Sequence, residues 1–137
     1  MEITIPFSDI SRYVSEHYGQ TITFETVSNK EVEASFRKKV LIVNLNLKVE
    51  ITVEKVNPAE ITLSYDSNFA VEFIISKVLN YLKERYPDVG KGLTTASDQR
   101  VIIDLEKIDK AAPFTRNVAL KEINIEDNSI RILASLK

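Results

Sequence analysis

Few side chains in this sequence have the type and spacing that chemistry requires, and its single histidine is His17. One imidazole cannot provide the paired-histidine spacing of a metalloprotease, and the chain has no cysteine. Gly90-Lys91-Gly92 is neither a phosphate-binding loop nor a dinucleotide fingerprint, and no G-x-S-x-G elbow presents a nucleophilic serine. We therefore expect His17 to be a structural residue near a helix end, and we expect no metal and no cofactor.

Carboxylates are the remaining candidates for acid–base chemistry. Asp98, Asp104, Glu106 and Asp109 are spread over a predicted loop and the outward side of a predicted strand. Two of them could pair as a general acid and a general base. Acidic residues in such positions more often form a solvated sheet face. The sequence therefore predicts that the protein is not an enzyme.

Length and charge exclude several classes of protein. The 137 residues fit one domain, 1–137, and 18 Lys and Arg against 20 Asp and Glu give a net charge of -2. Because nucleic-acid binding needs a basic surface, no nucleic-acid partner is expected. No window approaches the roughly 20 apolar residues of a transmembrane segment. Without a leader the expected compartment is the cytoplasm, or the periplasm and envelope if a leader has been removed.

The strongest structural pattern is the alternation of aliphatic and polar residues over 41–53, which predicts one long strand. Arg37-Lys38-Lys39 is expected to be the turn before it. A capped helix from Ser8 to Tyr18 should stop at Gly19, and a second, longer helix is expected over 69–86.

The C-terminal third is predicted to begin with a Gly-, Thr- and Ser-rich loop over 87–100, the candidate gate. Strands are expected at 101–108, 117–126 and 129–135, the last two joined by a tight Asp127-Asn128 turn. The alternation slips between Leu120 and Ile123, which indicates a β-bulge at Lys121-Glu122. The element order favours an α+β fold, with a strongly curved antiparallel sheet wrapped around the 69–86 helix and the N-terminal helix beside it.

These long strands and the helix must bury a large aliphatic surface. One interpretation is a well-filled core, in a non-enzymatic domain that binds a protein partner. The other, which we take as the predicted function, is a groove between sheet and helix that binds a lipid or another apolar small molecule. The residues predicted to line that groove are Phe36, Tyr65, Phe69, Phe73, Val78, Tyr81 and Phe114.

The closing hairpin carries a resemblance to a known family. A Pro-containing loop precedes 118–123, and an Asp-Asn turn leads into Ile130-Arg131-Ile132-Leu133-Ala134. Together with the helices at 8–18 and 69–86, this resembles the tubular lipid-binding superfamily in its small bacterial single-domain form. The resemblance implies a hydrophobic-ligand site and no catalytic residues. Such bacterial relatives are generally exported or lipid-anchored, whereas this chain has neither a leader nor a lipobox cysteine.

Overall fold

A computed structural model of the chain describes residues 1–40, 43–66, 75–76, 79–80, 83–84, 86–96 and 99–137. Antiparallel strands dominate this part of the chain. The strands are β1 (Glu2–Pro6), β2 (Thr21–Thr26), β3 (Glu31–Val40), β4 (Val43–Asn57), β5 (Glu60–Tyr65), β6 (Leu93–Ala96), β7 (Arg100–Asp104), β8 (Val118–Glu126) and β9 (Ser129–Leu136). The helices are α1 (Phe7–Tyr18), α3 (Pro87–Lys91) and α4 (Ala112–Asn117), with 3₁₀ turns at Leu105–Lys107 and Asp109–Ala111.

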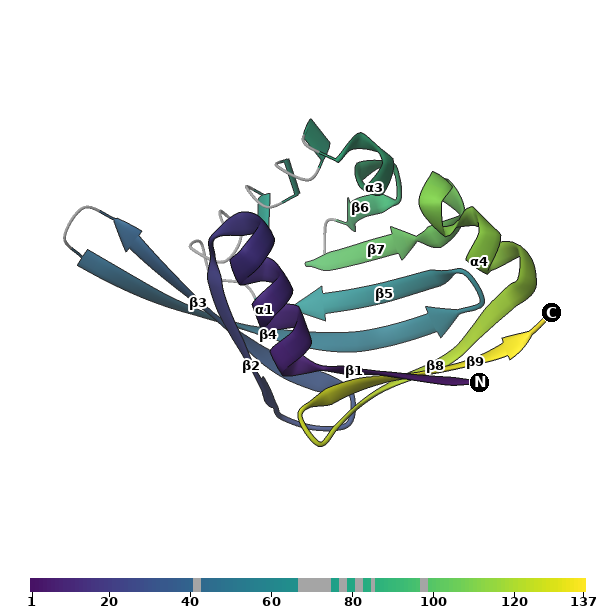
Figure 1. Cartoon of the computed structure of the whole chain (residues 1–137), viewed down its shortest axis with the longest axis horizontal. Coiled ribbons are helices and arrows are strands. Elements are labelled where there is room, and N and C mark those ends of the chain that lie inside the picture. Colours follow the sequence, from purple (N-terminus) through teal and green to yellow (C-terminus); the bar gives the residue numbers. More distant parts are fainter. Residues whose placement is uncertain (41–42, 67–74, 77–78, 81–82, 85, 97–98) are drawn as a thin grey trace.

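The strands form two sheets, and every pairing within them is antiparallel. One sheet has six strands in the order β2-β3-β4-β5-β7-β6, and the other has three strands in the order β1-β9-β8. Strand β8 lies against β4, and α1 links β1 of the small sheet to β2 of the large one (Figure 1). Both chain ends lie at the same end of the three-stranded sheet.

Local sequence explains where α1 and the last hairpin end. Gly19 adopts a left-handed conformation (φ 63°) and its N–H donates to the Ser15 carbonyl, which terminates α1 as predicted. The expected side-chain cap is absent: Pro6 occupies the N-cap position without a side-chain hydrogen bond. Asp127 and Asn128 both have positive φ, 48° and 58°, as a two-residue hairpin turn requires. The predicted turn between β8 and β9 is confirmed.

The core consists of two apolar clusters. In the first, Phe7 from α1, Val32 from β3 and Ile125 from β8 pack together, so this cluster joins the helix to both sheets. The Phe7 and Phe24 rings lie 5.5 Å apart within it. In the second, Val49 and Tyr65 pack on the six-stranded sheet. The alternation along β4 therefore separates a buried side from a polar side, as the sequence predicts.

Strands β3 and β4 extend past their neighbours as a two-stranded ribbon (Figure 1). Strand β2 pairs with β3 only as far as Arg37, and β5 pairs with β4 only from Ile51 onward. The predicted turn at Arg37-Lys38-Lys39 is therefore wrong, because all three residues belong to β3 and pair with residues 44–46. Where a strand has lost a neighbour, its sequence no longer needs an apolar alternation, so a run of cations can continue the strand.

The predicted arrangement of one curved sheet around one long helix is wrong. The strands divide into two sheets, and the helices α1, α3 and α4 have 12, 5 and 6 residues. Within the described part of the chain, no helix is long and apolar enough to cross a membrane. Most of the predicted 69–86 helix lies outside the described residues. Periodicity shows that one side of a strand is buried but not which element covers it, so it could not separate a second sheet from a covering helix.

The segment 87–100 is not the open loop that the sequence predicted. It contains α3 and β6, and β6 pairs with β7. The Asp88 carboxylate accepts hydrogen bonds from the N–H groups of Asp109 (2.6 Å) and Lys110 (3.2 Å), which lowers the pKa of Asp88. A Cβ at Gly92 would lie 2.5 Å from Ile108 Cγ1, so this glycine allows a close approach of two segments rather than a moving gate.

Candidate functional site

The structure brings together two of the seven residues predicted to line an apolar groove. Phe36 and Tyr65 both belong to the cluster around Val49, where Ile75 and Val101 also pack. Tyr65 is only 8% exposed, whereas Phe36 is partly exposed. Phe114 lies on α4 and is not part of this cluster. The remaining predicted lining residues, Phe69, Phe73, Val78 and Tyr81, lie outside the described residues.

His17 lies in the last turn of α1, at the helix end where the sequence places it. Its Nδ1 lies 3.0 Å from the Tyr13 carbonyl oxygen, and its ring stacks on the Tyr13 ring with centroids 3.9 Å apart. The Nδ1–H tautomer donates this hydrogen bond. Across the described part of the chain, no three His, Asp or Glu side chains are arranged to hold a metal ion.

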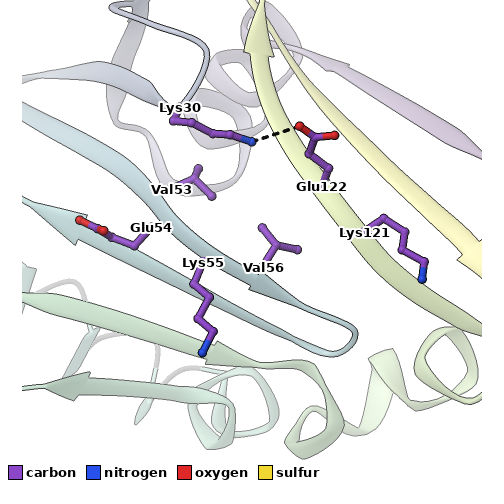
Figure 2. A pocket seen from close by; sticks show the side chains of 7 residues that line it. All are labelled: Lys30, Val53, Glu54, Lys55, Val56, Lys121 and Glu122. Atoms are coloured by element: carbon purple, nitrogen blue, oxygen red, sulfur yellow. Dashed lines mark ion pairs between the residues drawn. The ribbon is translucent and has the colours of Figure 1, made fainter.

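A polar pocket lies where two β-bulges adjoin (Figure 2). The register of β4 shifts between Val53 and Lys55, and that of β8 shifts between Leu120 and Glu122. The second bulge was predicted; the first carries the same signal, a phase slip in the apolar pattern of β4, but was missed. The pocket measures about 160 Å³, below the roughly 300–1,000 Å³ of ligand pockets. Its lining residues are Lys30, Val53, Glu54, Lys55, Val56, Lys121 and Glu122.

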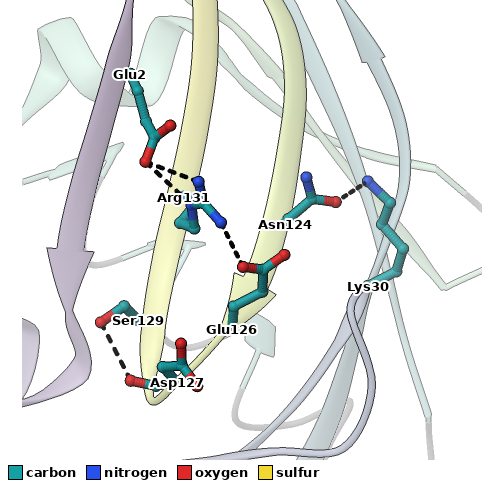
Figure 3. Close-up of polar contacts among 7 residues, drawn as sticks. All are labelled: Glu2, Lys30, Asn124, Glu126, Asp127, Ser129 and Arg131. Atoms are coloured by element: carbon teal, nitrogen blue, oxygen red, sulfur yellow. Dashed lines mark hydrogen bonds and ion pairs between the residues drawn. The ribbon is translucent and has the colours of Figure 1, made fainter.

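Lys30 closes one side of this pocket and ties the two sheets together. Its ammonium donates to the Ile123 carbonyl (2.7 Å) and to Asn124 Oδ1 (2.8 Å), as Figure 3 shows for Asn124. It also lies 3.6 Å from Glu122 Oε1. Two backbone bonds add to this connection: Leu120 N–H donates to the Pro58 carbonyl (2.9 Å) and Ile125 N–H to the Asn29 carbonyl (2.8 Å). The β8 edge of the three-stranded sheet is therefore closed against the six-stranded sheet.

The opposite edge of the small sheet is formed by β1, which pairs with β9 and also carries a side-chain contact to one arginine. Arg131 on the middle strand β9 lies between Glu2 on β1 and Glu126 on β8 (Figure 3). Its Nη2 is 2.9 Å and its Nε 3.1 Å from Glu2 Oε1. The hydrogen bond from Arg131 lowers the pKa of Glu2. Beyond this contact, Glu2, Ile3 and Thr4 are all exposed, and Ile3 is 37% exposed.

A row of carboxylates crosses the outward side of the six-stranded sheet. Glu25 on β2 pairs with Glu33 on β3, and Glu33 pairs with Glu50 on β4. Asp66, at the end of β5, donates its N–H to the Glu50 carbonyl oxygen. Like charges in directly opposed positions destabilise a sheet. The hydrogen bond with the Asp66 carboxyl and then its charge raise the pKa of Glu50, and Lys48 partly compensates by lying 3.9 Å from Glu33.

Comparisons with protein families, with curated proteins and with solved structures found no match to this chain. The resemblance to the tubular lipid-binding superfamily therefore stays a prediction. Function must be argued from the surfaces of the chain itself, and the two surfaces with the most distinctive geometry are the closed and the open edge of the three-stranded sheet.

Proposed function

We propose that this chain is a non-enzymatic domain that binds a protein partner. The observation that carries the proposal is the open β1 edge of the three-stranded sheet. Glu2, Ile3 and Thr4 are exposed there, and among the described residues no strand pairs with the outer side of β1. Ile3 is 37% and Met1 58% exposed, and an unpaired strand with exposed apolar residues readily recruits another chain.

The composition of the polar pocket and the position of Glu50 support the non-enzymatic part of this proposal. The pocket between the two bulges combines Lys30, already engaged by Glu122, with the apolar side chains of Val53 and Val56. Catalysis needs an activated nucleophile or a poised acid–base pair. Glu50, whose pKa is raised, is not among the residues that line this pocket.

The test is the mass of the native particle. Tagged protein is purified from cells under native conditions, and its mass is measured by size exclusion with light scattering over a range of concentrations. We expect a mass above 15.6 kDa at a fixed stoichiometry, with either a second copy or another protein. A single-chain particle at every concentration, with no stoichiometric companion from cell extract, would contradict the proposal.

A second candidate function is the binding of an apolar small molecule. It is supported by the position of Phe36, which is partly exposed beside the buried Tyr65 in the second core cluster. An apolar ligand at this place would extend an existing core. Titration with a fluorescent fatty acid should then give saturable binding that Phe36→Ser weakens, while Val27→Ser, at a 50% exposed site elsewhere, does not. No saturable binding by the unaltered protein would remove this candidate.

A further inference from the structure

We infer that the partner at one surface is a second copy of this chain, bound through antiparallel pairing of β1 with β1 across a two-fold axis. This inference deepens the proposed function and rests on it. Identical strands that pair antiparallel generate a closed two-fold dimer, the commonest symmetry of protein oligomers. The pairing would join the three-stranded sheets of the two copies into one continuous sheet that spans the dimer.

The hydrogen bonds of β1 show which of its backbone groups are available. Met1 and Ala134 exchange two bonds of 3.0 and 2.9 Å, and Phe7 N–H donates to the Asn128 carbonyl (2.9 Å). Inward and outward directions alternate along an antiparallel strand. The backbone groups of Ile3 and Ile5 therefore point to β9, and those of Glu2 and Thr4 point out of the sheet. Among the described residues, no strand pairs with this outer side of β1.

Only one register allows the outward N–H and C=O groups of Glu2 and Thr4 to form all their hydrogen bonds without opposing two like charges. If Ile3 lies opposite Ile3 of the second copy, Glu2 lies opposite Thr4, and both outward residues exchange their N–H and C=O groups. A register centred on Glu2 would place two carboxylates opposite each other, which is destabilising. A register centred on Thr4 would oppose Glu2 to Pro6, which has no N–H to donate. The sequence of β1 therefore selects the register centred on Ile3.

The exposed apolar residues of the three-stranded sheet lie on its core-facing side, and pairing with a second copy would continue this apolar side across the dimer. Ile3 pairs with Ile132, which pairs with the buried Ile123, so Ile3 belongs to the core-facing side. Met1, which lies opposite the buried Ala134, and Leu136 lie on the same side and are 58% and 75% exposed. A second copy would therefore place Ile3 beside Ile3 and Met1 beside Ile5.

The charge at this edge is already compensated. Glu2 is the acidic residue of β1, and Arg131 holds its carboxylate at 2.9 Å. In the register centred on Ile3, this carboxylate lies opposite the neutral Thr4 of the second copy. Charged side chains normally protect an edge strand against pairing, but the Arg131 contact draws this charge back onto the sheet.

Engineered cysteines give a direct test, because the chain contains none of its own. In the inferred register Ile3 is a non-hydrogen-bonded pair with itself, with Cα atoms about 4.5 Å apart, within the range that a disulfide spans. Thr4 is offset from Thr4 of the second copy by two residues, more than about 7 Å. We expect Ile3→Cys to form a disulfide-linked dimer under mild oxidation and Thr4→Cys, the matched control, to remain a single chain on the same timescale.

A second pair of variants separates pairing from folding. Thr4→Pro removes an outward N–H and keeps the bonds of β1 to β9, whereas Ile3→Pro removes an inward one. Thr4→Pro should raise the dimer dissociation constant at least about tenfold with the thermal transition of the single chain retained, and Ile3→Pro should lower that transition as well.

The outcomes also separate this inference from the proposed function. If the particle is larger than one chain but Ile3→Cys does not crosslink, or if Thr4→Cys crosslinks equally, the β1 pairing is wrong and partner binding stands. If the protein is a single chain without companions at every concentration, both are wrong. An unchanged dissociation constant for Thr4→Pro would also overturn the pairing.

Discussion

The two edges of the three-stranded sheet differ in how their backbone groups are used. At the β8 edge, Leu120 and Ile125 donate N–H bonds to turns of the six-stranded sheet, and Lys30 adds a bond to the Ile123 carbonyl. At the β1 edge, three consecutive residues are exposed, and among the described residues no strand pairs with the outward backbone groups of Glu2 and Thr4. The β8 edge is thus bonded to the six-stranded sheet, whereas the outer side of β1 has no neighbouring strand among the described residues.

This contrast indicates which features allow a protein to retain an unpaired edge strand. An unpaired strand readily recruits other chains, so proteins usually shorten it, bend it or place charges along it. Strand β1 is short and ends at Pro6, and its single acid is engaged by Arg131. These features limit pairing to one register rather than prevent pairing. We interpret the β8 edge as a stability element and the β1 edge as a recognition element.

The largest expected difference between the two edges is in packing energy. Ile125 on β8 is 3% exposed and belongs to the first core cluster, whereas Ile3 on β1 is 37% exposed. Ile125→Ala should lower the free energy of unfolding by about 2–5 kcal/mol, and Ile3→Ala by less than about 1 kcal/mol in the single chain. Urea titrations at high dilution would measure both, and equal losses would contradict the contrast.

A smaller effect is expected at the lysine that closes the β8 edge. Lys30→Met removes hydrogen bonds to the Ile123 carbonyl and to Asn124, and should cost about 1–2 kcal/mol of unfolding free energy. Lys55 lines the same pocket, and Lys55→Met, the matched control, should change stability by less than about 0.5 kcal/mol. If both variants lose the same amount, Lys30 is not a specific link between the sheets.

The smallest expected effects are electrostatic and depend on pH. Because its pKa is lowered in the folded state, Glu2 contributes stability above its ordinary pKa, and this is lost as the pH falls through the lowered value. The raised pKa of Glu50 has the opposite sign: the folded state is favoured as the pH falls toward the ordinary value and disfavoured as the pH rises above the raised value.

Two variants can separate these contributions. Relative to the unaltered protein, Glu2→Gln should lose less stability on acidification below about pH 4, and Glu50→Gln should lose less stability as the pH rises above about pH 4. Melting temperatures across this range measure both slopes. If both substitutions change the pH dependence of the melting temperature in the same direction, the carboxylate row and the Arg131 contact do not have opposite effects on stability.

Local features were predictable where one residue type decides the conformation. Gly19 ends α1 and Asp127-Asn128 turns the last hairpin, because both places need positive φ. The bulge at Lys121-Glu122 was visible because the apolar pattern slips by one residue. In contrast, the start of the long strand was predicted at Leu41, because the four consecutive aliphatic residues 40–43 do not show where one strand ends and the next begins. Strand β3 ends at Val40 and β4 begins at Val43, and Leu41 and Ile42 lie outside the described residues.

The arrangement of the sheets and the open edge were not predictable in this way. The alternation in β1 and β9 shows that one side is apolar, but not that a second sheet covers it only in part. That Lys30 reaches β8, 93 residues further along the chain, has no local signal. Of the predicted lining residues, Phe36 on β3 and Tyr65 on β5 share a cluster because both strands flank β4 and both residues follow its alternation. Phe114 belongs to a separate helix.

The most direct test of the account is amide hydrogen exchange along β1, measured by NMR in concentrated and in dilute protein. The N–H groups of Ile3 and Ile5 point to β9 and should be protected at both concentrations, whereas the Thr4 N–H points outward. We predict that the Thr4 amide exchanges at least about tenfold more slowly in the concentrated sample, while Ile3 and Ile5 change far less. Equally fast exchange of Thr4 at both concentrations would contradict the account.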